Sequence, residues 1–195
     1  MKCLVLAMLL VGSTTIALAQ MGEVSLSLGK SIMRNNSLGS TLDALGNAVS
    51  APLDTNLHLA LRMTVNNSRF FGHEFGYAYN RSSLKFGSES VGMPIHQGFY
   101  DFLLYATKEG SKIRPFAAGG VGFSSFFPPG ASVFSGNGVT KFGFNYGAGI
   151  KVRVSDTFLI RLDARDYATG KPDFGINPQG WLHQLSVSAG LGFCF

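Results

Sequence analysis

The fold is decided by the segment Lys141–Val154, which reads KFGFNYGAGIKVRV. Every second residue is apolar, and these residues are Phe142, Phe144, Tyr146, Ala148, Ile150, Val152 and Val154. The residues between them are Lys141, Gly143, Asn145, Gly147, Gly149, Lys151 and Arg153. A period of two puts the apolar side chains on one face of an extended chain, whereas a helix would need a period near 3.6. The segment therefore predicts a β-strand with one apolar and one polar face.

The same alternation recurs along the rest of the chain. It is clean in Asn56–Val65, Phe158–Arg165 and Gln184–Phe195. It is less regular in Val24–Leu28, Phe71–Tyr79, His96–Ala106 and Arg114–Phe126. Together with the first segment, these stretches predict an all-β protein with eight antiparallel strands.

Charge is scarce in this chain. Only 14% of its 195 residues are charged, and it contains 25 glycines and 17 phenylalanines. An ordinary soluble domain carries about 25% charged residues. The aromatic content excludes a disordered chain. No run of about 18 apolar residues predicts a membrane-spanning helix. The low charge must therefore be explained by the alternating strands.

Residues 1–19 have the layout of a secretory signal peptide. Lys2 precedes an apolar run, and Ala17-Leu-Ala19 forms a small-x-small cleavage site. The alternative is a short buried helix. We expect cleavage after Ala19, which leaves residues 20–195 as one domain and lowers the formal net charge from +5 to +4, because only Lys2 is lost. Cys194 is then the sole cysteine, so an internal disulfide is excluded.

Short and long connections alternate between the predicted strands. The short polar ones are residues 66–69, 108–111 and 155–156. The long ones are residues 34–53, 81–93, 127–138 and 168–180. Short turns at one end and long loops at the other are typical of an up-and-down outer-membrane barrel. An even number of strands also places both termini at the short-turn end.

Composition indicates which face of the strands points outward. The polar face is rich in Gly, Ser and Ala, which suits the crowded interior of an eight-stranded barrel better than a surface in water. Aromatic residues on the apolar face are expected to form two girdles at the membrane interfaces. The predicted girdle consists of Phe71, Tyr79, Phe142, Tyr146, Phe158, Trp181 and Phe193. We therefore predict a transmembrane barrel, with a soluble lipocalin-like barrel as the alternative.

Three segments resemble the small OmpA-like outer-membrane β-barrel domains. They are Arg114–Phe123, Lys151–Tyr167 and Leu191–Phe195. The resemblance implies a location in the outer membrane of a Gram-negative bacterium. It also implies that Leu191, Phe193 and Phe195 form the signal that the barrel-assembly machinery reads.

The polar face also carries charged residues that are expected to lie in the lumen. These are Arg62, Glu74, Asp101, Lys151, Arg153, Arg161, Asp163 and Arg165. One interpretation is a network of ion pairs that plugs the lumen, because unpaired buried charges are costly. The other is a narrow channel lined by charge, or a proton path. The short connection at residues 66–69 predicts that Arg62 and Glu74 are partners.

No chemistry is indicated by the remaining motifs. The histidines His58, His73, His96 and His183 lack metal-ligand spacing, so we predict no metal, cofactor or catalytic site. A lipid A-modifying enzyme is kept as an alternative. His183 and Ser186 have opposite parity and should point to opposite faces. The small, scattered positive charge does not favour nucleic acid, but it favours contact with anionic lipopolysaccharide.

The long connections supply the remaining expectations. Residues 40–49 predict a short helical segment. Residues 124–134 are unusually apolar, which fits either a partner-binding tip or packing across the barrel mouth or against the lipid headgroups. We therefore expect a monomeric, structural or interactive outer-membrane protein. Its partners are outer-membrane lipid, the assembly machinery and an extracellular ligand at the loops.

Overall fold

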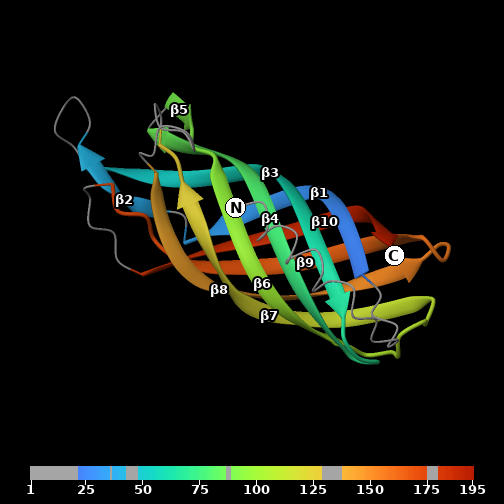
Figure 1. The fold of residues 1–195 in the computed structure, drawn as a ribbon. Helices are drawn as coiled ribbons and strands as arrows, with labels where there is room; N and C mark the ends of the chain where they lie inside the picture. The colour runs from blue at the N-terminus through green and yellow to red at the C-terminus, as the bar shows by residue number, and fades with distance from the viewer. Residues whose placement is uncertain (1–21, 36, 43–47, 87–88, 129–137, 175–179) are drawn as a thin grey trace, which may run out of the picture.

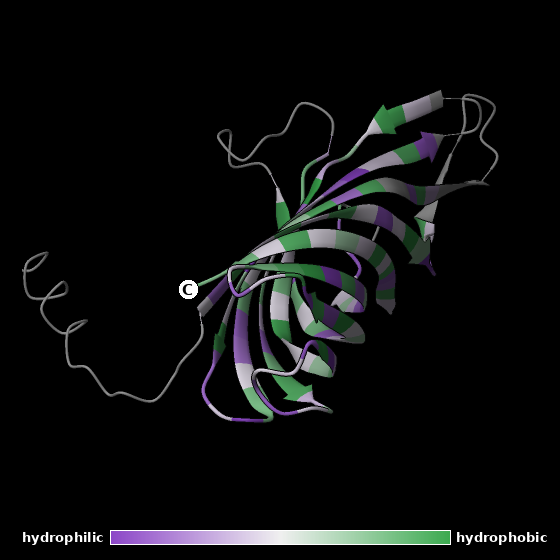
Figure 2. Cartoon of the chain, turned by 90° about the vertical axis from the view of Figure 1, so that its right-hand side faces the viewer, coloured by the Kyte–Doolittle hydropathy of each residue, from purple (hydrophilic) through white to green (hydrophobic). Residues whose placement is uncertain are grey.

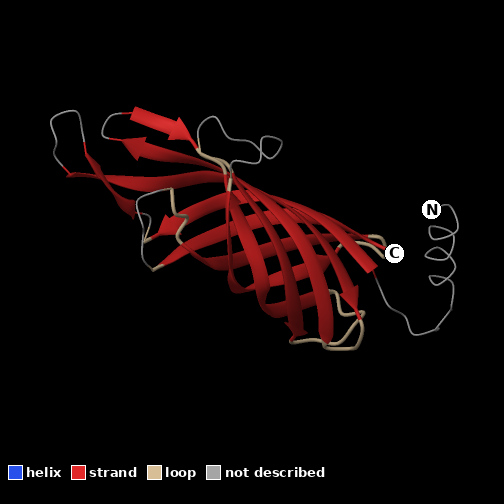
Figure 3. Cartoon of the chain, turned by 60° about the vertical axis from the view of Figure 1, so that its left-hand side comes forward, coloured by secondary structure: helices blue, strands red, loops and turns tan. Residues whose placement is uncertain are grey.

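The computed structural model describes residues 22–35, 37–42, 48–86, 89–128, 138–174 and 180–195. The predicted signal peptide, residues 1–19, lies outside this range. The described part of the chain consists of strands joined by turns and loops (Figure 3). Within it, no helix is long and apolar enough to cross a membrane.

Ten strands form a single antiparallel sheet (Figure 1). They are β1 (Gly22–Arg34), β2 (Ser37–Leu42), β3 (Ala48–Asn66), β4 (Phe71–Phe86), β5 (Glu89–Gly92), β6 (Ile95–Tyr105), β7 (Ile113–Phe126), β8 (Val139–Arg153), β9 (Phe158–Gly170) and β10 (Trp181–Cys194). Their order is β2-β3-β1-β10-β9-β8-β7-β6-β4-β5, and β3 also pairs with β4. That pairing closes eight strands into a barrel and leaves β2 and β5 outside the ring. The predicted eight-stranded antiparallel barrel is confirmed.

The strands β2 and β5 lie in segments that the sequence predicts to be long loops. β2 pairs with residues 48–52 of β3, and β5 pairs with residues 83–86 of β4. The helical segment predicted at residues 40–49 is therefore wrong, because Ser40, Thr41 and Leu42 belong to β2. A register shift between Thr55 and Leu57 separates this upper part of β3 from its barrel part. The shift breaks the alternation, which hides the continuing strand from a pattern search.

The connections follow the predicted alternation. Residues 67–70, 106–112 and 154–157 join strands at the end that holds both termini, which we call the short-turn end. There the N–H of Gly22 donates to the carbonyl of Phe195 at 3.0 Å, and the N–H of Phe195 donates back at 2.9 Å. The opposite end, which we call the long-loop end, carries the β2–β3 and β4–β5 hairpins (Figure 1).

Apolar and polar residues alternate along the strands as the sequence predicts (Figure 2). The outer face of the barrel carries large exposed apolar side chains on every barrel strand, among them Leu26, Leu61, Phe75, Phe102, Val121, Phe144, Leu162 and Val187. The inner face carries small, polar and charged residues. This is the reverse of a soluble protein, in which apolar side chains are buried and charges face water. Such an arrangement is stable when lipid surrounds the barrel.

Candidate functional site

Three arginines and three carboxylates fill the middle of the lumen. They come from four strands and are Arg62, Glu74, Asp101, Arg161, Asp163 and Arg165. All six side chains are at most 1% exposed. Because three positive charges face three negative charges, the cluster is neutral overall. We call it the central ion network.

Glu74 is the hub of the central ion network. Its Oε2 accepts a hydrogen bond from Nη1 of Arg161 at 2.5 Å, and its Oε1 accepts one from Nη2 of Arg165 at 2.9 Å. The Nε of Arg62 lies 3.7 Å from the same Oε1. Glu74 also accepts a hydrogen bond from the hydroxyl of Thr64, its cross-strand neighbour, at 2.9 Å. One carboxylate therefore holds three guanidinium groups in place.

Two aspartates complete the central ion network. Asp163 accepts hydrogen bonds from Nε and Nη2 of Arg161 at 3.1 and 2.7 Å, and its Oδ1 lies 3.6 Å from Nη2 of Arg62. Asp101 forms an ion pair with Arg165 from the opposite side. Arg161, Asp163 and Arg165 are alternate residues of β9, so the period of the strand points all three inward.

A second group of charges lies at the short-turn end of the lumen. Lys151 forms an ion pair with Glu23 and donates a hydrogen bond to the hydroxyl of Tyr105 at 2.9 Å. The side-chain amide of Asn66 donates to Oε1 of Glu23 at 2.9 Å. The guanidinium of Arg114 stacks on the Tyr105 ring, 3.6 Å from its centroid. This group therefore forms a second layer of charged and polar contacts between the central ion network and the short-turn end.

Uncharged polar side chains lie on the other side of the central ion network. Nδ1 of His58 and Oδ1 of Asn80 are 2.7 Å apart. The amide of Asn80 donates to Gln97 at 2.8 Å, and the amide of Gln97 donates to Ser124 at 2.9 Å. These contacts connect β3, β4, β6 and β7 across the interior. They place a layer of hydrogen-bonded side chains between the central ion network and the long-loop end.

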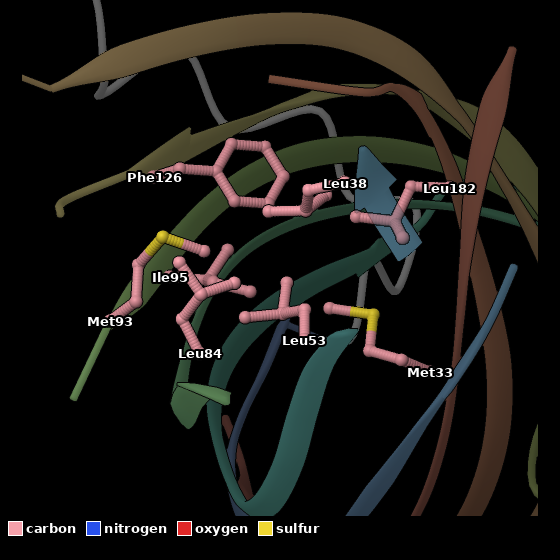
Figure 4. Close-up of a cluster of buried hydrophobic side chains, with 8 residues drawn as sticks. All are labelled: Met33, Leu38, Leu53, Leu84, Met93, Ile95, Phe126 and Leu182. Atoms are coloured by element: carbon pink, nitrogen blue, oxygen red, sulfur yellow. The ribbon is translucent and has the colours of Figure 1, made fainter. Parts of the chain in front are cut away.

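An apolar cluster lies at the long-loop end of the lumen, and Figure 4 shows its side chains gathered between the strands. We call it the mouth cluster, and it consists of Met33, Leu38, Leu53, Leu84, Met93, Ile95, Phe126 and Leu182, with Phe174 packed against it. None of the eight core members is more than 9% exposed. Phe126 belongs to the apolar 124–134 segment, and its neighbour Phe127 packs edge-on against His96. Phe126 thus packs at the mouth and Phe127 packs on the outward-facing His96, while residues 129–137 lie outside the described range.

The structure places seven of the eight predicted lumen charges inside the barrel. The eighth, Arg153, lies at the short-turn end, where it donates a hydrogen bond to Glu109 at 3.2 Å. Arg62 and Glu74 are partners, as the short turn predicts. Sequence reasoning missed Glu23 and Arg114, although both share the inward parity of their strands. Of the mouth cluster, only Phe126 lies in a segment for which packing at the mouth was an alternative, and the register shift in β3 turns Leu53 inward against the alternation of the barrel part of that strand.

The predicted girdle residues lie on the outer face of the barrel. Phe142 is the most exposed, at 79%, and only Tyr79 is half-buried. Phe158 contacts Phe193 at the short-turn end, with ring centroids 5.8 Å apart. Toward the long-loop end, Trp181 stacks on Phe144 at 6.1 Å. Leu191, Phe193 and Phe195, which the resemblance implies as the assembly signal, also point outward.

The described residues hold no cluster of three or more His, Cys, Asp or Glu side chains that could bind a metal ion. His183 faces outward, and its Nδ1 lies 3.3 Å from Asp166. Ser186 faces inward and donates its hydroxyl to the carbonyl of Arg165 at 3.2 Å. The two side chains lie on opposite faces, as their parity predicts. The buried Cys194 points inward beside the short-turn end.

A closed antiparallel barrel with an apolar exterior and a polar interior of paired charges defines a small integral outer-membrane protein. The chain belongs to the family described as "Outer membrane protein beta-barrel domain", whose profile matches residues 3–193. The short-turn end is thus the periplasmic end of such a barrel, and the long-loop end is the extracellular end.

Several solved outer-membrane barrels share this fold. Neisserial surface protein A is 12% identical with a TM-score of 0.62, over 89% of this chain and 97% of that one. OprG from Pseudomonas aeruginosa is 14% identical with a TM-score of 0.62, over 91% and 96%. Ail of Yersinia pestis is 14% identical with a TM-score of 0.51, over 91% and 100%. No curated protein sequence matches the chain.

Proposed function

We propose that this protein is a sealed, non-catalytic outer-membrane barrel that acts through its extracellular surface. The observation that carries the proposal is the filled lumen, which contains a neutral ion network between a periplasmic charge layer and an apolar mouth cluster. A solute would have to displace buried ion pairs and a packed apolar layer, both of which are costly. The outer surface and the extracellular hairpins are the parts that remain free to act.

The extracellular hairpins offer a surface for a partner. β2, the upper part of β3, the upper part of β4 and β5 form a four-stranded extension beyond the barrel (Figure 1). β2 and β5 are the edge strands of this extension. An edge strand presents unpaired backbone groups, which can bind an extended segment of another protein. The extension therefore supports an interaction role at the cell surface.

The experiment compares cells that express the full chain with cells that express a trimmed chain. The trimmed variant replaces residues 40–50 by a two-residue turn, which shortens the β2–β3 hairpin to its base at Ser37 and Pro52 and leaves every barrel pairing in place. We expect both proteins to show heat-modifiable gel mobility and only the full chain to increase attachment of the cells to host cells or matrix. Equal attachment by both, or no attachment by the full chain, would contradict the interaction role.

The enzyme alternative makes a different prediction. His183 and Asp166 form a dyad on the outer surface, but within the described residues no serine hydroxyl is hydrogen-bonded to His183. A hydrolase that uses this dyad would need such a nucleophile. We expect the mass spectrum of lipid A to be unchanged when the protein is expressed. A loss or gain of one acyl chain would support the enzyme instead.

A further inference from the structure

The outward-facing side chains mark a boundary between apolar and polar surface at the extracellular end. On seven barrel strands, the outward residues between the periplasmic end and this boundary are mostly apolar. On each of these strands, one polar residue then marks the boundary. These positions are Lys30, Arg81, His96, Ser125, Thr140, Asp166 and His183. A ring of this kind lies where the acyl chains of the outer leaflet end and the lipid headgroups begin.

Most polar groups near this boundary have partners within the protein. Asp166 pairs with His183 at 3.3 Å, and the hydroxyls of Ser125 and Thr140 are 2.8 Å apart. The Tyr77 hydroxyl contacts the ring of His96. Slightly further out, Lys85 pairs with Asp54 at 3.0 Å. These groups can therefore meet the membrane interface without an external ligand.

Lys30 and Arg81 are different. Both side chains are exposed, and neither has a hydrogen-bond or ion-pair partner among the described residues. Lys30 in β1 pairs with Leu57 in β3, and Leu57 pairs with Arg81 in β4. Two strand spacings place the two cations about 10 Å apart on the same face. Two long flexible side chains at that spacing can converge on one anionic group between them.

A hollow lies beside Arg81 and reaches Leu57, the residue that pairs with Lys30. It has a volume of about 590 Å³ and is lined by Leu57, Arg81, Ser82, Ser83, Ser90 and Gly92. Ser83 and Ser90 add hydroxyl groups that can donate hydrogen bonds to an anion. A Cβ added at Gly92 would meet no atom within 4 Å, so this side of the hollow is open. Below the cations, the exposed Leu28 and Leu59 continue into the apolar band.

We propose that Lys30, Arg81 and this hollow form a binding site for the phosphorylated headgroup of an outer-leaflet lipid of the lipid A type. The cations and hydroxyls match a phosphate on a sugar, and the leucines below match acyl chains that descend from the same headgroup. A free phosphate ion would use only the upper half of this arrangement. The site therefore selects a lipid that carries both chemistries.

The test uses the folded protein in uncharged detergent, with the bound lipid counted by native mass spectrometry. The probes are lipid A, lipid A with its phosphates removed, and inorganic phosphate. We expect lipid A to bind and the other two probes to bind much more weakly. K30Q/R81Q should bind lipid A with an affinity about 30-fold lower than that of the wild type. Each basic residue near a membrane surface raises the affinity for anionic lipid about fivefold, and the double variant lacks two of them.

Two further variants separate the site from general charge and from misfolding. K108Q/K112Q removes two exposed cations at the periplasmic end, so lipid A binding should not change. Gly92→Phe fills the hollow and keeps both cations, so lipid A binding should fall. Heat-modifiable gel mobility tests whether each variant is folded. If K30Q/R81Q does not fold, the single variants Lys30→Gln and Arg81→Gln take its place.

Three results would overturn the proposal. They are wild-type lipid A binding by K30Q/R81Q, equal binding of dephosphorylated lipid A, and an equal loss in K108Q/K112Q. Binding of inorganic phosphate that is lost in K30Q/R81Q would instead assign the site to a free anion. The hollow is lined mainly by β4 and β5, whereas the trimmed variant that tests the partner-binding role changes only residues 40–50, so the two proposals are tested by different substitutions.

Discussion

At the scale of single residues, the interior depends on Glu74. Its carboxylate contacts Arg62, Arg161 and Arg165, and all four side chains are fully buried. Glu74→Gln keeps the size of the side chain but leaves one of three buried positive charges without compensation. Breaking a buried ion pair costs about 3–5 kcal/mol. We expect the free energy of unfolding, measured by urea titration in lipid vesicles, to fall by that amount.

A surface ion pair provides the control for this prediction. Asp54 pairs with Lys85 at 3.0 Å, but both side chains are about half exposed. Exposed pairs contribute about 0–1 kcal/mol, so Asp54→Asn should change the stability little. If Glu74→Gln destabilised the barrel no more than Asp54→Asn does, the central ion network would not have the role that we assign to it.

Residue positions inside the barrel were partly predictable from the sequence. Parity alone places Arg161, Asp163 and Arg165 on the inner face. It cannot say which partner each one meets, because that depends on the register of strands that are distant in the chain. The Arg62–Glu74 pair is the exception, since a short turn fixes the register between its two strands. Glu23 could have been found from the alternation in β1, because it lies two residues before Ser25 and therefore on the same inward face as Ser25 and Ser27.

At the scale of the strands, β7 shows how the wall makes room for the network. Gly120 faces inward opposite Asp101, and a Cβ there would lie 1.9 Å from the carbonyl oxygen of Tyr100. Its neighbour Gly119 faces outward, and a Cβ there would meet nothing within 4 Å. Gly120→Ala should therefore cost about 1–3 kcal/mol of unfolding free energy, because a backbone segment must move.

The adjacent glycine is the matched control for this substitution. Gly119→Ala adds the same methyl group on the outer face, where there is space, and should leave stability unchanged or slightly higher. Urea titration of both variants in the same vesicles gives the comparison. If both substitutions changed the free energy of unfolding by the same amount, close packing around Gly120 would not be the reason for a glycine at this position.

The strand β10 carries the residues that resemble an assembly signal. Phe195 is 68% exposed on the outer face, while its backbone bonds to Gly22. Because its ring is not packed inside the barrel, Phe195→Ala should refold normally in detergent but reach the outer membrane of cells in lower amounts. Phe71→Ala removes an outward aromatic ring at the same end and serves as the control. An equal loss from the membrane in both variants would contradict a recognition role for Phe195.

The number of barrel strands was predictable, and their full length was not. Alternation is strong where one face meets lipid and the other meets the lumen. Beyond the membrane both faces meet water, so the hairpins that contain β2 and β5 lose the two-residue period. The register shift between Thr55 and Leu57 also inverts the parity of the upper part of β3 relative to its barrel part. For this reason the sequence predicted a helix and loops where the structure has strands.

At the scale of the whole molecule, scarce charge and abundant glycine have one explanation. Half of each barrel strand faces lipid and carries almost no charge. The other half must fit inside a ring of eight strands, which leaves space for little more than the side chains themselves. The charges that remain in the barrel are paired in the lumen or lie near the membrane boundaries. The mouth cluster adds an apolar layer, of which the sequence indicated only the part contributed by Phe126.

The central claim is that this barrel is sealed, and planar bilayer recording of the purified protein tests it most directly. We predict no steady conductance above that of the protein-free bilayer, since the ion network and the mouth cluster close the lumen at two levels. A general porin in the same bilayer serves as the positive control. Large, steady and reproducible channels from the folded protein would contradict the sealed lumen and favour the narrow-channel alternative.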